Sequence, residues 1–116
     1  MKKTIFMSRE KGEKWLAALR SGEYKQGVGV LCNKEKYCCL GVLQKVVSGE
    51  VENLSVPSLS WLEKNNVIFR VNGKLDLRGN PSLAFSSAAE LNDDGVSFFN
   101  LADLIEVAME YTDENV

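Results

Sequence analysis

The sequence contains no histidine. This absence removes the usual base of Ser-His-Asp and Cys-His nucleophile activation, both imidazole ligands of the HExxH zinc helix, and histidine phosphotransfer. Catalysis by paired carboxylates or by lysine would need a recognisable spacing of those residues, and the chain shows none. We therefore predict that the protein is not an enzyme, with no catalytic residue and no cofactor.

Proline and long apolar runs are also scarce. The chain has 2 prolines in 116 residues, and 26% of its residues are charged against 45% hydrophobic. In the opening MKKTIFMSREKGEK, three apolar residues follow the two lysines and a threonine, whereas a signal peptide needs about seven or more. We expect a single domain spanning residues 1–116, located in the cytosol of the host cell, with no membrane partner.

Basic residues are missing from the last third of the chain. Residues 1–78 contain all 14 Lys and Arg against 8 acidic residues, whereas residues 79–116 contain 8 acidic residues and no basic one. Two interpretations stay open. The two parts pack together and neutralise each other, or the first part forms a basic cleft for an anion while the acidic surface faces elsewhere.

Cysteine is limited to three residues, all within GVGVLCNKEKYCCLGVL, residues 27–43. A structural zinc site needs four ligands, usually from paired cysteines or histidines, so we predict no metal site. We expect GVGVLC and YCCL to form a β-hairpin around the loop NKEK, with Tyr37 opposite Cys32. Cys38 and Cys39 would then point to opposite faces of a strand. The cysteines are interpreted as small buried hydrophobes, and a thiol activated by the loop lysines is the alternative.

A second hairpin is indicated by VIFRVNGKLDLRG. Its Asn72-Gly73 pair suits a type I′ turn, because both turn residues must accept a positive φ. That turn would place Arg70 opposite Leu75. We expect the two hairpins to form one antiparallel sheet.

Helical spacing and capping residues predict about five helices. Ser8 and Gly22 bound the first, over residues 9–21, and the second ends near Gly49. A third, short helix follows Pro57. A capping box at residues 87 and 90 opens a fourth, and Ser97 caps the last. The predicted fold class is therefore α+β, with about five helices around the sheet of two hairpins.

The segment RSGEYKQGVG is the best candidate for ligand contact. Arg20 and Lys25 could pair with phosphates, Tyr24 offers a stacking face, and the glycines permit close approach of an anion. The same segment can also be interpreted as a helix cap followed by a strand entry. The candidate ligand-binding residues are Arg20, Tyr24, Lys25, Gln26, Tyr37, Arg70 and Asn92.

The segment AELNDDGVSFFNLADLIE resembles the first helix, turn and second helix of a DNA-binding helix-turn-helix, which is a third functional alternative. A recognition helix is normally basic. Here the following residues, VAMEYTDENV, are acidic and would repel phosphates. Nucleic acid is therefore not expected as a partner.

Three segments, WLAALRSGEYKQG, YCCLGVL and LNDDGVSFFNLADLIE, occur in this order. As a set they resemble a group of short bacteriophage proteins, over most of the chain and least between residues 48 and 86. The resemblance implies an accessory, anti-defence role exerted by binding. Such a protein could sequester a nucleotide-derived signal as a homo-oligomer. Alternatively, it could block a host defence protein through the acidic face of the last helix, with Asp103, Glu106 and Glu110.

Overall fold

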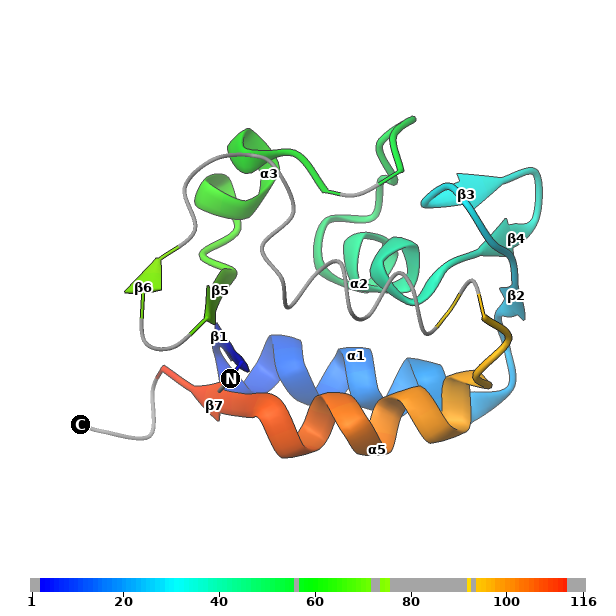
Figure 1. Cartoon of the computed structure of the whole chain (residues 1–116). Helices are drawn as coiled ribbons and strands as arrows, with labels where there is room; N and C mark the ends of the chain where they lie inside the picture. Colours follow the sequence, from blue (N-terminus) through cyan, green and yellow to red (C-terminus); the bar gives the residue numbers. More distant parts are fainter. Residues whose placement is uncertain (1–2, 56, 72–73, 76–91, 93, 113–116) are drawn as a thin grey trace.

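The computed structural model describes residues 3–55, 57–71, 74–75, 92 and 94–112, with side chains except at 3–4, 69–71 and 74–75. It is a small α+β structure in which helices and short strands pack around one core (Figure 1). The helices are α1 (Arg9–Ser21), α2 (Cys39–Ser48), α3 (Leu59–Lys64) and α5 (Phe98–Ala108). The strands are β1 (Lys3–Met7), β2 (Lys25–Gln26), β3 (Cys32–Asn33), β4 (Lys36–Tyr37), β5 (Ile68–Val71), β6 (Lys74–Leu75) and β7 (Met109–Tyr111).

The strands form two mixed sheets instead of the single antiparallel sheet that we predicted. One sheet has the order β6-β5-β1-β7, and the other has the order β2-β4-β3. β1 runs antiparallel to β5 and parallel to β7, and β2 runs parallel to β4. The prediction is wrong because the two hairpins belong to different sheets. Strands from the two ends of the described chain complete the larger one.

Within each hairpin the predicted pairing is confirmed. Arg70 lies opposite Leu75, and Cys32 lies opposite Tyr37. The first hairpin is tighter than expected, since Asn33 also pairs with Lys36 and leaves a turn of two residues. The Asn72-Gly73 turn lies outside the described residues.

Local capping signals account for α1 and its bounds as predicted. The Ser8 side chain accepts a hydrogen bond from Lys11 N, and Gly22 ends the helix with φ 78. A residue without a Cβ adopts this left-handed conformation at little cost. The described part of the chain holds four helices. The predicted helix at Ser87 and Glu90 lies outside it.

The helices bury the core between them. α1 packs against both α2 and α5, and the inward side of α1 buries Trp15, Leu16 and Leu19. The Trp15 ring is fully buried, and its Nε1 donates a hydrogen bond to Cys39 O at 2.9 Å. This bond ties the middle of α1 to the first residue of α2. No helix among the described residues has the length and apolarity needed to cross a bilayer.

The cysteines pack as buried hydrophobes for the most part, but Cys38 and Cys39 do not lie on a strand. Cys38 caps α2, its Sγ accepting a hydrogen bond from Gly41 N at 3.4 Å, and Cys39 is the first helical residue. Cys38 and Cys39 are buried, whereas Cys32 is half-buried. The predicted alternation fails because the chain turns into the helix directly after Tyr37. Helix α2 therefore begins at Cys39.

A close crossing fixes where α2 begins. Leu31 O accepts a hydrogen bond from Cys38 N at 3.1 Å, and Leu31 N donates to Leu54 O at 2.9 Å. A Cβ placed on Gly41 would lie 1.9 Å from Leu31 O. Glycine is therefore required at position 41 by a neighbouring backbone and not by its own φ.

A carboxylate clamp holds the chain between α2 and α3. Gln44, which is fully buried, donates to Glu52 Oε1 at 2.7 Å and accepts from Glu52 N at 2.9 Å. Ser58 donates its N–H and its hydroxyl to the same carboxylate, at 2.8 and 2.6 Å. Burial acts to raise the pKa of Glu52, but the hydrogen bonds from Ser58 and Gln44 outweigh it and lower that pKa.

We expect Gly41→Ala to lower the free energy of unfolding by about 3 kcal/mol, because the Leu31 backbone must move to admit the methyl group. Urea denaturation measures the loss. Gly12→Ala is the matched control. Its Cβ would meet the Tyr111 ring at 2.5 Å, and a side chain can rotate away. If Gly41→Ala lowered the free energy of unfolding no more than Gly12→Ala does, the close contact between Gly41 and the Leu31 backbone would be contradicted.

We expect the stability to fall in acid through Glu52. Its folded pKa is lowered, so the stabilisation is present above the unfolded pKa and is lost as the pH drops below about 5 through the folded value. Glu52→Gln should show a shallower decline in denaturation midpoint between neutral and acidic pH than the unaltered protein. If the denaturation midpoints of the two proteins fell equally with pH, the hydrogen bonds of Glu52 to Gln44 and Ser58 would be contradicted.

Candidate functional site

The small sheet carries an open, basic hollow on one face. Its volume is about 630 Å³, and its lining residues are Lys25, Asn33, Lys34, Glu35 and Lys36. We call it the lysine hollow. Three cationic side chains and one anionic side chain give it a net positive charge at neutral pH.

Strand register explains why these residues share a face. Lys25 on β2 and Asn33 on β3 both lie directly opposite Lys36 on β4. Directly opposed residues project to the same side of a sheet, and their neighbours along each strand project to the other. The turn between β3 and β4 adds Lys34 and Glu35 at the open end.

The arrangement of the three lysines opposes stability. Like charges on neighbouring positions of paired strands repel one another, and Lys25 is the register partner of Lys36 in the parallel pair of β2 and β4. Lys34 adopts φ 59, which is unfavourable for a residue with a Cβ. None of the three ammonium groups forms an ion pair with an acid in the described part of the chain. Such local conflicts tend to occur at functional sites.

Glycine 27 lets β2 come close enough for this pairing. Gly27 N donates to Tyr37 O at 2.7 Å, and a Cβ on Gly27 would lie 2.8 Å from Lys36 Cβ. A larger residue would push β2 away from β4. The glycine that we interpreted as allowing approach of an anion therefore allows approach of the neighbouring strand.

The aromatic candidates lie behind the lysines and not among them. Tyr24 and Tyr37 meet edge to face, with ring centroids 5.3 Å apart and planes at 89°. Both are half-buried and pack against the core. Burial is the main reason why the pKa of Tyr37 is raised, so its phenol stays neutral at physiological pH. Their position leaves the hollow without the stacking face that we expected.

Two further candidates, Gln26 and Asn92, bond to each other inside the protein. Gln26 Nε2 donates to Asn92 Oδ1 at 3.0 Å and to Val96 O at 2.7 Å. Asn92 is fully buried; its Oδ1 also accepts from Cys39 N at 3.1 Å, and its Nδ2 donates to Gly27 O at 2.7 Å. This single amide links β2, the start of α2 and the segment before α5. It is thus engaged within the fold.

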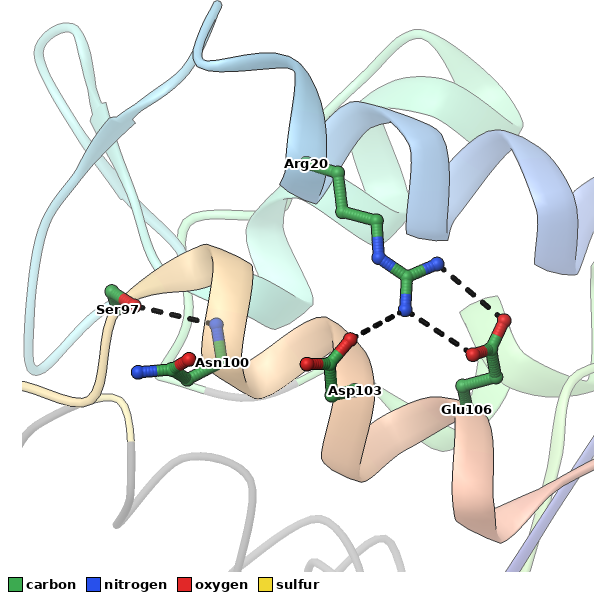
Figure 2. A network of polar contacts seen from close by, with 5 residues as sticks. All are labelled: Arg20, Ser97, Asn100, Asp103 and Glu106. Atoms are coloured by element: carbon green, nitrogen blue, oxygen red, sulfur yellow. Dashed lines mark hydrogen bonds and ion pairs between the residues drawn. The ribbon is translucent and has the colours of Figure 1, made fainter.

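Arg20 is held by the acidic helix. Its Nη2 lies 2.8 Å from Asp103 Oδ1 and 3.2 Å from Glu106 Oε1, as Figure 2 shows. The hydrogen bonds that the guanidinium donates to Glu106 and then to Asp103 raise its pKa. In the same view Ser97 caps α5 through Asn100 N at 3.3 Å. Here the basic and acidic parts of the chain neutralise each other, as the first interpretation of the charge asymmetry expects.

Arg70 belongs to the other sheet, on β5. Its side chain lies outside what the structure describes. Of the seven candidate residues, the structure places Lys25 in the lysine hollow. Sequence reasoning assigned Asn33, Lys34 and Lys36 to a loop, although the alternation of charges in NKEK could have indicated a basic turn.

The lysine hollow is chemically suited to holding an anion. Lysine ammonium groups act as mobile point charges toward phosphate, and the Asn33 amide can add a directed hydrogen bond. Within the described residues, no group of three or more Cys, Asp or Glu side chains is placed to hold a metal ion. The lysine hollow is a candidate site for phosphate or carboxylate groups.

We expect Asn92→Leu to lower the free energy of unfolding by about 3 kcal/mol, because Cys39 N would lose a buried acceptor and the half-buried Gln26 amide would lose one of its two acceptors. Thermal or urea denaturation measures this. Lys64→Gln, an exposed change on α3, is the control and should be neutral. If Asn92→Leu left stability unchanged but altered ligand binding, the amide would be a ligand contact instead of a structural clamp.

Comparison with known proteins identifies a family without an assigned function. No curated protein and no solved structure matches the chain. Residues 7–70, which contain the small sheet and the lysine hollow, match the family described as Domain of unknown function (DUF8296). This match covers more than half of the chain, and the protein therefore belongs to the DUF8296 family.

Proposed function

We propose that this protein binds a phosphorylated small molecule of the nucleotide type in the lysine hollow and catalyses no reaction on it. The observation that carries the proposal is the direct pairing of Lys25 with Lys36, with Lys34 beside them and no described acid paired to any of the three. A bound polyanion would relieve the repulsion between the lysines. Binding would thereby turn a destabilising cluster into a stabilising one.

The phosphate charge of the ligand should contribute more to its affinity than its nucleobase does. The tyrosine pair lies on the opposite side of the sheet from the lysines, so the hollow offers ammonium groups and one amide but no aromatic face. Affinity should therefore rise with the number of phosphates on the ligand. The nucleoside part would contribute less.

An open hollow suits sequestration best when a second copy closes it. A single chain leaves a bound phosphate group accessible to water, because the hollow is open to solvent. A homo-oligomer that covers this face would shield the ligand and slow its release. The three segments that resemble bacteriophage proteins support a role in the host cytosol, where a nucleotide-derived defence signal would be the molecule removed.

A panel of anions tests the proposal directly. We expect ATP, a cyclic dinucleotide and tripolyphosphate to raise the melting temperature, and adenosine to leave it unchanged. A ligand at 100 times its Kd should add about 2.7 kcal/mol of stability. Native mass spectrometry of the same samples reports the bound mass and the number of subunits together. The proposal fails if none of these phosphate compounds shifts the melting temperature.

The variant Lys25→Gln/Lys36→Gln separates binding from folding. Removing the repulsion should leave the free energy of unfolding unchanged or slightly higher without ligand, while the shift caused by tripolyphosphate disappears. Lys45→Gln/Lys64→Gln is the matched control, since it removes two lysines on α2 and α3 and should retain the full shift. If tripolyphosphate shifted the melting temperature of both double variants equally, its binding would be a nonspecific charge effect and not specific to the lysine hollow.

A further inference from the structure

Helix α5 carries exposed apolar residues on the side that faces away from the core. The inward residues Phe98, Leu101 and Ile105 are buried, whereas the outer residues Phe99 and Val107 are 60% and 88% exposed. Leu104 is 52% exposed. In Figure 1, α5 lies along one edge of the molecule beside α1. The helix is therefore covered on one side.

The exposed apolar residues of α5 lie on its outer side. Val107 lies three residues after Leu104 and eight after Phe99, so the three fall within less than half of the helix circumference, with Asp103 between Phe99 and Val107. Single exposed apolar residues are ordinary, whereas three on one side of a helix mark a candidate interaction site. We call this side, with Asp103 and Glu106, the outer face of α5.

The charges on this face determine which partner it fits. Asp103 and Glu106 remain 62% and 56% exposed while they bind Arg20, and Glu110 is exposed just beyond the helix. α5 carries no basic residue, so the face keeps a net negative charge after Arg20 is counted. Two copies of the face laid together would bring like charges into contact. A partner with basic residues around an apolar centre is complementary.

We propose that the outer face of α5 is a docking surface for a protein partner that has an apolar groove with lysine or arginine residues at its rim. Phe99, Leu104 and Val107 enter the groove, as helix-in-groove complexes require, and the carboxylates meet the basic rim. Arg20 contributes by holding Asp103 and Glu106 in place before binding. This surface is separate from the lysine hollow, and neither proposal depends on the other.

The experiment uses synthetic helical peptides as probes. One peptide is a two-helix hairpin with a leucine-lined groove between its helices and lysine at the rim of that groove, and a second carries glutamate in place of lysine. Fluorescence anisotropy at about 150 mM ionic strength, where distant charges are screened, should show binding of the lysine peptide alone. No binding of the lysine peptide, or equal binding of the two peptides, overturns the proposal.

Two double variants locate the binding surface. Leu104→Gln/Val107→Gln should weaken the lysine peptide at least about tenfold. Val28→Gln/Leu54→Gln, which removes two apolar residues of similar exposure away from α5, should leave affinity unchanged. If the α5 double variant fails to fold, Val107→Gln alone, at the most exposed position, gives the same comparison. Equal losses in both double variants, or a homodimer that the α5 variant abolishes, overturn the proposal.

Discussion

The first turn of α2 is the point on which the rest of this structure depends. Trp15 donates to Cys39 O from α1, Asn92 accepts from Cys39 N, and Leu31 O accepts from Cys38 N while lying against Gly41. Segments that are far apart in the sequence thus satisfy the polar groups at one helix end. Since unsatisfied buried groups are costly, moving this turn would loosen α1, β2 and the loop at Leu31 together. The small sheet is consequently supported from behind by the core.

Because the inward face of the small sheet is held by the core, its outward face can carry like charges side by side. The face of the small sheet that points inward carries Gln26 and Tyr37, which bond or pack within the protein, and the face that points outward carries the opposed Lys25 and Lys36. Repulsion between lysines is tolerable where the strands are held by other contacts. The acidic charge of α5 is partly neutralised, because Arg20 on α1 pairs with Asp103 and Glu106. The described chain therefore carries a basic hollow and an acidic, partly apolar surface on different elements.

Much of the fold could be predicted from local signals. Ser8, Gly22, Gly49 and Ser97 bound helices where the sequence placed those bounds, and both hairpins pair in the predicted register. The sheet could not be predicted, because β1 pairs with β5 and β7 across most of the chain and such pairing leaves no local pattern. Ligand contact by the candidate residues stays a prediction. The polarity of Gln26 and Asn92 indicated polar contacts, and in the structure these residues bond to each other and to the protein's own backbone.

By itself the sequence determined the absence of imidazole chemistry, the positions where helices begin and end, and the separation of basic and acidic residues along the chain. These properties follow from composition and from contacts within a few residues. The tertiary structure alone decided which charges meet. Strand register placed Lys25 against Lys36, and helix packing placed Arg20 against Asp103 and Glu106. Both outcomes depend on contacts between segments distant in sequence, because a side chain finds its partner only once the backbone has been folded around the core.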